Sequence, residues 1–217
     1  MNTTDIILIC TNAPILLVAL YAGYYFSTFG KELRVFSGFL FLSVLIQFPS
    51  SILSFFYTNN MPLLHLYTLL GGLILILFYR TLLQNYLPDK TLKYGAGLYV
   101  LFILIDSLFI ENVFTFNTIG LTVEAVIIVI LALSSFLILM NEHTAFNNKK
   151  LLKGITWINS GLFIYFTSNL LLYYFGDYLV HQSVSISSFK IIWMLHSLFL
   201  ITMYLFFFVG LWKASKN

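Results

Sequence analysis

The chain has 217 residues, of which 60% are hydrophobic and only 9% are charged, and its formal net charge is +3. A soluble domain carries about a quarter charged residues, so this composition excludes a water-soluble globular protein and indicates an integral membrane protein. The single cysteine, Cys10, excludes an internal disulfide framework and a cysteine-rich metal site.

Seven apolar runs are long enough to cross a bilayer, which takes about 20 mostly apolar residues per helix. The spans are predicted at residues 5–27, 35–57, 62–86, 94–111, 118–140, 152–176 and 188–212. The segment MNTTD carries no basic residue, so we expect the first run to be a span and not a cleaved signal peptide. Pro62 fits a first helical turn, and Pro88 is expected to end the third span. Short polar connections without an internal repeat predict one domain, residues 1–217, an all-α seven-transmembrane helix bundle.

The basic residues predict the orientation of this bundle. If the spans alternate in direction, ten of the eleven Lys and Arg residues fall on one side: Lys31, Arg34, Arg80, Lys90, Lys93, Lys149, Lys150, Lys153, Lys213 and Lys216. Only Lys190 falls on the other side. Because basic residues stay in the cytoplasm, the N-terminus is predicted outside and the C-terminus inside, in a multi-pass protein of the cell (inner) membrane. Rhodopsins and hormone receptors share this topology, a likeness of architecture that does not establish function.

Polar residues inside the first three spans follow helical spacing. Asn12 precedes Pro14 in the first span, and His65 and Thr68 begin the third, which later contains Gly71-Gly72. The glycine pair predicts close approach of a neighbouring helix. The second span contains four polar residues that follow one another at intervals of four, three and four positions: Ser43, Gln47, Ser50 and Ser54. This spacing places them on a single helical face beside Pro49.

The later spans carry the polar residues that are costliest at membrane depth. Asp106 lies near the outer end of the fourth span, and Glu124 lies about two turns inside the fifth. The sixth span has one stripe, formed by Tyr165, Asn169 and Tyr173, and the seventh has His196 beside Trp193 and Ser197. With the predicted topology, the outer half of the membrane contains His65, Asp106, Glu124, Asn169 and His196. This asymmetry predicts a pocket that opens outward.

A small-ligand site is therefore predicted from two sets of side chains. The polar contacts are expected from Glu124, His196, Asn169, Gln47 and His65, and the walls from Tyr165, Tyr173 and Trp193. A charged carboxylate at the membrane centre costs about 2.5–3.5 kcal/mol, so Glu124 is expected to be protonated or paired with His196 or His65. A pair of Glu124 with His196 would make the site responsive to pH.

The same polar and basic residues bear on four other functions: retinal binding, nucleic-acid binding, zinc-dependent hydrolysis and proton-coupled transport. The last span has no central lysine for a retinal Schiff base, and the dispersed basic residues do not indicate a nucleic-acid partner. A zinc-dependent membrane hydrolase would need three ligands, for which His65, Glu124 and His196 are the candidates, but there is no H-x-x-x-H pair. A proton-coupled solute transporter could use Glu124 and His196 as a relay and Pro14 and Pro49 as helix breaks. No catalytic motif is present, so an enzyme is the less favoured class, and no cofactor is expected.

The last third of the chain adds a resemblance. The segments WINSGLFIYFTSNLLLYYFG (157–176) and IIWMLHSLFLITMYLFFFVGLW (191–212) resemble small stand-alone seven-span bacterial proteins, related to the membrane sensor parts of histidine-kinase systems. The resemblance lies on Trp157, Asn159, Asn169, Trp193 and His196, and it implies a sensory role. The chain has no output domain, so the resemblance implies a cytoplasmic or membrane signalling partner. The chain leaves open whether copies of it associate as a homo-oligomer.

Overall fold

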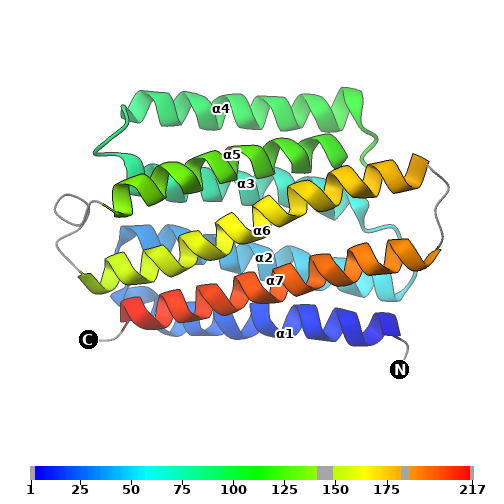
Figure 1. Ribbon diagram of the computed structural model, residues 1–217, viewed down its shortest axis with the longest axis horizontal. Coiled ribbons are helices and arrows are strands. Elements are labelled where there is room, and N and C mark those ends of the chain that lie inside the picture. Colours follow the sequence, from blue (N-terminus) through cyan, green and yellow to red (C-terminus); the bar gives the residue numbers. More distant parts are fainter. Residues whose placement is uncertain (1–2, 141–148, 182–185, 216–217) are drawn as a thin grey trace.

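The computed structural model describes the backbone of residues 3–140, 149–181 and 186–215, and the side chains of residues 12–140, 149–173, 191–192 and 194–215. Over these ranges the chain is all-α, as predicted, and its seven α-helices lie side by side along one axis (Figure 1). They are α1 (Thr3–Tyr24), α2 (Lys31–Phe55), α3 (Met61–Leu83), α4 (Asp89–Ile105), α5 (Thr118–Leu139), α6 (Lys149–His181) and α7 (Ile186–Ser215). A short 3-10 helix, η1 (Phe26–Thr28), follows α1, and a π-helical segment, η2 (Asp106–Ile110), continues α4.

Six of these helices are long and apolar enough to cross a membrane over their described residues. The described part of α1, Asn12–Tyr24, is a shorter apolar helix. A span of 22 to 25 residues is roughly 33–38 Å long at 1.5 Å per residue, which matches the thickness of a bilayer core. The chain therefore has the architecture of a multi-pass membrane protein, and each predicted span falls on one of the seven helices.

The connection between α3 and α4 differs from the prediction. Helix α3 ends at Leu83, and Pro88 stands immediately before α4 instead of ending the third span. Helix α4 begins at Asp89, five residues earlier than predicted, where the carboxylate accepts a hydrogen bond from Arg80 Nε at 2.6 Å and pairs with Lys93 Nζ at 2.8 Å. Hydropathy missed this first turn because its residues are charged. Pro62 does lie in the first turn of α3, as predicted.

Six helices form a ring, with α4 outside it. Around the ring, α1 packs on α2, α2 on α3, α3 on α5, α5 on α6 and α6 on α7. Helix α7 closes the ring against α1. Helix α4 packs mainly on α3. A Cβ atom on Gly72 would lie 2.1 Å from Tyr99 Oη, and that hydroxyl donates to the carbonyl of Thr68 at 2.5 Å. Gly72 therefore admits a side chain of α4, whereas the glycine pair predicted the close approach of a neighbouring backbone.

Helices α6 and α7 make the most extensive contact of the ring. A Cβ on Gly154 would lie 2.7 Å from the Gly210 carbonyl oxygen, and a Cβ on Gly210 would lie 2.7 Å from the Gly154 carbonyl oxygen. About two turns further along α6, a Cβ on Gly161 would lie 2.8 Å from the Cβ of Phe206. These glycines let the two backbones touch, which is how helices pack closely in membranes.

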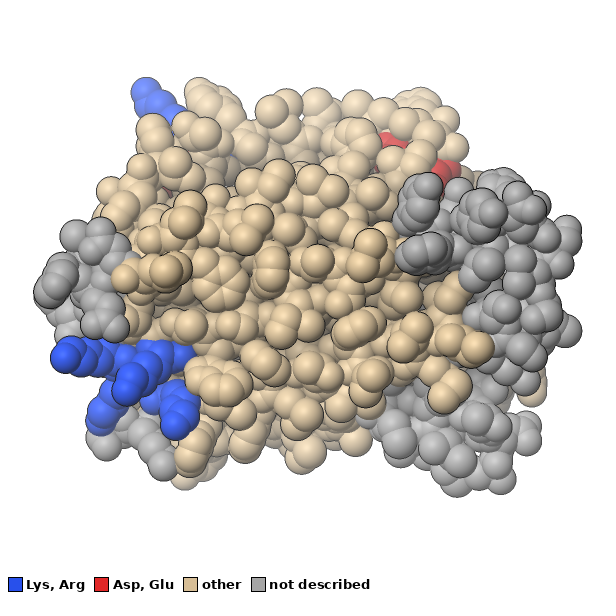
Figure 2. Space-filling model, viewed as in Figure 1, with Lys and Arg blue, Asp and Glu red and all other residues tan. Residues whose placement is uncertain are grey.

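The two ends of the bundle differ in charge and in packing. All nine described Lys and Arg side chains lie at the end where α2, α4 and α6 begin, and Figure 2 shows several of them gathered there. We call this the basic end. The half of the bundle next to it is filled by large, fully buried side chains: Phe36, Phe78, Tyr79 and Phe207. There Tyr79 Oη donates to Asn159 Oδ1 at 2.8 Å, and Asn159 Nδ2 donates to the Ala132 carbonyl at 3.1 Å. These bonds join α3, α6 and α5.

Candidate functional site

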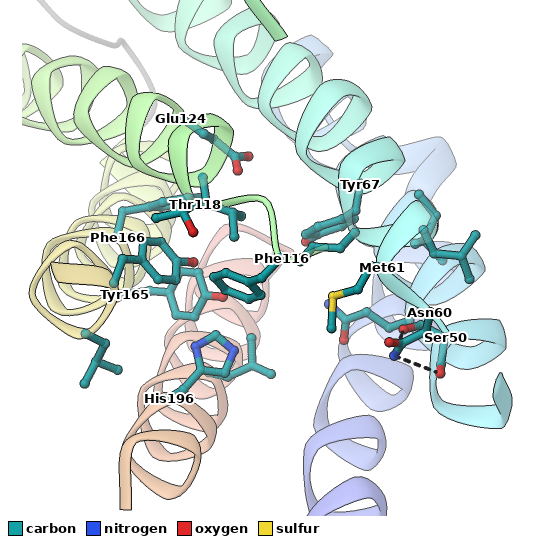
Figure 3. Close-up of a pocket in the computed structure, with 18 of the residues that line it drawn as sticks. Ser50, Asn60, Met61, Tyr67, Phe116, Thr118, Glu124, Tyr165, Phe166 and His196 are labelled. Atoms are coloured by element: carbon teal, nitrogen blue, oxygen red, sulfur yellow. Dashed lines mark hydrogen bonds between the residues drawn. The ribbon is translucent and has the colours of Figure 1, made fainter. Parts of the chain in front are cut away.

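A cavity of about 550 Å³ lies between the helices in the half of the bundle away from the basic end. Its walls come from α2, α3, α5, α6, α7 and the loop that precedes α5 (Figure 3). Small-molecule sites usually enclose about 300–1,000 Å³, so the size suits a small organic ligand. The walls include Asn60 and Phe116 in the loops at this end, and Phe116 is 37% exposed.

The walls are mostly apolar and include a few convergent polar groups. The apolar lining is Phe39, Ile46, Met61, Leu63, Leu64, Phe116, Leu121, Phe166, Leu172, Ile192 and Leu200. The polar lining is Gln47, Ser50, Asn60, Tyr67, Thr118, Glu124, Tyr165, Tyr173 and His196. Such a mixture is typical of ligand sites, where apolar walls hold the body of a ligand and a few polar groups orient it.

Glu124 is the one acidic residue of this lining. It lies on α5, it is only 3% exposed, and its carboxyl group extends toward the space between α5 and α3 (Figure 3). No hydrogen bond or ion pair joins it to any residue that the structure describes. Among the residues whose side chains the structure describes, no Lys or Arg lines the cavity, because the described basic side chains lie at the opposite end. A buried carboxyl group without a partner in the protein is costly, which makes Glu124 a candidate ligand contact.

His196 takes a partner other than Glu124. Its Nδ1 lies 2.8 Å from Asn169 Oδ1 on α6, and its ring centroid lies 5.9 Å from that of Tyr165. No hydrogen bond joins it to Glu124, and Figure 3 shows the two side chains at opposite sides of the cavity. The pair of Glu124 with His196, one of the alternatives considered from the sequence, therefore does not form in this structure. Asn169 Oδ1 accepts a hydrogen bond, so Nδ1 is the donor of the imidazole ring.

Gln47 and Tyr67 belong to a polar network on the α2 side of the cavity. Gln47 Nε2 donates to Tyr204 Oη at 3.2 Å. Ser43 Oγ donates its one hydrogen to the Phe39 carbonyl at 2.8 Å. Tyr67 Oη is therefore the donor in its 3.0 Å hydrogen bond with Ser43 Oγ. These bonds join α2 to α7 and to α3, next to the lining.

The second polar pair on α2 involves the following loop. Asn60 Nδ2 donates a hydrogen bond to Ser50 Oγ at 2.9 Å, and both residues line the cavity (Figure 3). Ser43, Gln47 and Ser50 thus lie on one face of α2, as their spacing predicted.

The structure brings five of the eight predicted site residues to one cavity: Gln47, Glu124, Tyr165, Tyr173 and His196. Asn169 is fully buried and contacts His196 from behind the lining. His65 does not line the cavity, and the side chain of Trp193 lies outside the described residues. The ligand-binding role of all eight stays a prediction.

The sequence did not single out several lining residues. Tyr67 and Phe116 are the clearest cases, because an aromatic residue near the end of a span is indistinguishable in sequence from the aromatic belt of a membrane protein. The position of Tyr67, two residues after His65, places it on a different side of α3 from the histidine. Only the packing of α3 shows which side faces the cavity.

His65 lies instead in a second polar cluster between α3, η2 and the loop before α5. Its Nε2 lies 3.3 Å from the Thr115 carbonyl, and its Nδ1 lies 2.9 Å from Ser107 Oγ. Asp106 at the start of η2 and Asn117 before α5 are both fully buried, and neither side chain makes a hydrogen bond with a described residue. Among the described residues, no three His, Cys, Asp or Glu side chains come together to hold a metal ion, so His65, Glu124 and His196 do not form the zinc site considered above.

A scan against protein-family models, a search of curated proteins and a search of solved structures each found no match for this chain. The class of this protein is therefore defined by its fold and its cavity alone. The chain is a helical multi-pass membrane protein with an internal, mainly apolar cavity and one buried carboxyl group in its wall. The resemblance to bacterial sensor proteins stays a prediction.

Proposed function

We propose that the protein is a membrane sensor, or receptor-like protein, that binds a small ligand in the cavity and signals to a cytoplasmic partner. Its N-terminus would lie outside and its C-terminus in the cytoplasm of the cell (inner) membrane. The observation that carries the proposal is the cavity of about 550 Å³ around the unpartnered Glu124 carboxyl group. A cavity of this kind is the default ligand site of a helix bundle.

The charge distribution supports an outward-facing site. The described Lys and Arg side chains lie at one end of the bundle, and basic residues next to spans face the cytoplasm. The cavity lies in the other half, and its lining includes Asn60 and the partly exposed Phe116 in the loops at that end. With that orientation, a ligand would enter from outside the cell.

Packing favours a sensor over a transporter. A transporter needs a path to each side of the membrane in turn, lined by polar groups. Here the half next to the basic end is filled by Phe36, Phe78 and Phe207, which are fully buried, and tied by the Tyr79–Asn159 hydrogen bond. A zinc hydrolase is also disfavoured, because His65 lies outside the cavity that Glu124 and His196 line.

The arrangement of helices offers a route for a signal. The cavity is bounded by α5 and α3 on the side of Glu124 and by α6 and α7 on the side of His196 (Figure 3). Because Gly154 and Gly210 hold α6 and α7 in backbone contact near the basic end, those two helices would move together. A ligand that draws the two sides closer would shift the basic ends of α4 and α6, where a cytoplasmic partner would bind.

The test uses the full chain in lipid nanodiscs, with tryptophol as a neutral probe of the cavity. Spin labels are placed on Lys90→Cys and Lys153→Cys in a Cys10→Ala background, since both lysines are exposed at the basic end. We expect bound tryptophol to shift the distance distribution between the labels. In the variant Leu172→Trp, the larger side chain is placed to fill the cavity. Adding tryptophol to this variant should leave the distance distribution between the labels unchanged. An unchanged distribution with tryptophol bound contradicts signalling. Proton-driven uptake into proteoliposomes that is abolished by Glu124→Gln would establish the transporter instead.

A further inference from the structure

We infer that the ligand of this cavity is a small organic amine, whose ammonium group pairs with the Glu124 carboxylate and whose hydrophobic body fills the apolar part of the cavity. The inference rests on the proposed function, because it names the chemical class of ligand for the same site. It depends on three properties of the lining: its charge, its aromatic faces and its apolar volume.

The charge of the lining selects a cation. Glu124 is the only Asp, Glu, Lys or Arg that lines the cavity among the described side chains, and it has no hydrogen-bond or ion-pair partner among them. A carboxyl group that is 97% buried either holds its proton or pairs with an opposite charge, since a buried charge without its partner costs several kcal/mol. Without a bound cation Glu124 therefore holds its proton, and a bound cation makes its ionisation favourable. An anionic ligand would place a second negative charge beside Glu124. An ammonium group supplies both the charge and the N–H donors that the carboxylate oxygens lack.

The aromatic lining provides a second attraction for the same charge. Among the described side chains, six Phe and Tyr rings line the cavity: Phe39, Tyr67, Phe116, Tyr165, Phe166 and Tyr173. The face of an aromatic ring attracts an ammonium group within about 6 Å, and the attraction grows when the site excludes water. Figure 3 shows Tyr67, Phe116 and Tyr165 around the space into which Glu124 extends. A cation bound there lies between the carboxylate and these rings.

The volume and the apolar walls require that the cation be organic. A bare metal ion would need several oxygen or nitrogen ligands, and no group of three His, Cys, Asp or Glu side chains forms among the described residues. The remaining wall is made by aliphatic side chains such as Ile46, Leu64, Leu121 and Leu200. A cavity of about 550 Å³ with such walls gains most of its binding energy from a hydrophobic ligand body.

Three indole compounds of the same shape separate charge from fit: tryptamine is cationic, tryptophol is neutral and indole-3-acetate is anionic. Their binding is measured by isothermal titration calorimetry on the full chain in phosphatidylglycerol nanodiscs, a lipid with no ammonium group. We expect tryptamine to bind tightest and indole-3-acetate not to bind. In Glu124→Gln the affinity for tryptamine should fall by about 10- to 100-fold, as expected for the loss of a charge-assisted hydrogen bond. The affinity for tryptophol should change little.

Three further variants test whether the effect is specific to the charge of Glu124 and to the aromatic wall. Asp106→Asn removes another fully buried carboxyl group outside the lining, and it should leave tryptamine binding unchanged. Tyr165→Phe keeps the aromatic face and should retain binding, whereas Tyr165→Leu removes it and should weaken tryptamine more than tryptophol. Circular dichroism on each variant shows that the helices are retained.

Each outcome decides the inference. Equal binding of tryptamine and tryptophol, unaffected by Glu124→Gln, overturns the amine while leaving the cavity and the proposed sensor intact. Failure of all three compounds to bind overturns both the amine and the ligand-binding function. If phosphatidylethanolamine added to the nanodiscs displaces tryptamine, the ammonium group comes from a lipid headgroup. If it does not, the ligand is a free amine.

Discussion

His196 on α7 donates a hydrogen bond from Nδ1 to Oδ1 of Asn169 on α6, across 2.8 Å, at the wall of the cavity. The bond joins the two helices that already make the most extensive contact in the bundle. It also orients the imidazole ring, whose centroid lies 5.9 Å from that of Tyr165. The histidine is therefore a positioned wall residue and not the partner of Glu124.

A double-mutant cycle tests this contact. Asn169→Leu and His196→Leu should each destabilise the bundle, because each leaves a buried polar partner unpaired. The double variant should cost less than the sum of the two. Interhelical hydrogen bonds in membranes couple by about 0.6 kcal/mol on average and by at most about 1.7 kcal/mol. The measurement is the free energy of unfolding in SDS micelles followed by circular dichroism. A coupling energy of zero would show that the bond does not stabilise the protein.

The glycine contact between α6 and α7 gives the second prediction. Gly154→Ala should separate the two backbones and lower the free energy of unfolding by about 1–3 kcal/mol, since the new Cβ meets the Gly210 carbonyl oxygen at 2.7 Å. Gly210→Ala should behave in the same way, because it meets the Gly154 carbonyl.

The matched control for the glycine contact is Gly97→Ala on α4, where an added Cβ has no neighbour within 4 Å. It should be neutral, or stabilising by up to about 1 kcal/mol, because alanine is the better helix former. Equal effects at Gly97 and Gly154 would refute close backbone contact between α6 and α7.

Labelling from outside the cell tests the orientation. In the Cys10→Ala background, Thr58→Cys at the cavity end and Thr91→Cys at the basic end both place a thiol on an exposed position. With the basic end in the cytoplasm, a membrane-impermeant maleimide should label Thr58→Cys in intact cells. It should label Thr91→Cys only after the membrane is permeabilised. The reverse pattern would place the cavity on the cytoplasmic side and would contradict the proposed direction of ligand entry.

Glu111 provides a prediction on pH. Burial raises the pKa of the Glu111 carboxyl group above its usual 4.5, although its hydrogen bonds from the backbone N–H groups of Ile119 and Thr118 act in the opposite direction. The folded chain then holds this proton more tightly than the unfolded chain does. Its contribution to stability is therefore complete below about pH 4.5 and is lost as the pH rises through the folded pKa.

The variant Glu111→Gln keeps an acceptor for the N–H groups of Ile119 and Thr118 but does not titrate in this range. Its free energy of unfolding should depend less on pH than that of the wild type between about pH 4 and about pH 8. The difference is measured by SDS unfolding of both proteins over that range. Parallel pH profiles would show that Glu111 has the same pKa in the folded and unfolded chains.

Part of the candidate site could be predicted from the sequence, because spacing along a helix defines a face. Gln47 and Ser50 lie three residues apart on α2, and Tyr165 and Tyr173 lie eight apart on α6, and all four line the cavity. His65 shows the limit of this reasoning. It begins the same helix as Tyr67, but it turns toward Ser107 and Thr115, and only Tyr67 faces the cavity.

The sequence by itself determined the class of the protein, the number of helices and the gathering of basic side chains at one end. These follow from local composition, since a run of apolar residues forms a helix in a bilayer wherever it packs, and alternation of spans then places each loop. Tertiary structure decided that α4 lies outside a ring of the other six helices and that His196 bonds Asn169. It also left Glu124 facing a cavity without a hydrogen-bond or ion-pair partner among the residues that the structure describes. The neighbours of a helix depend on which side chains are small enough to admit them, as at Gly72 and Gly154, and no spacing within one helix specifies the surface of the helix beside it.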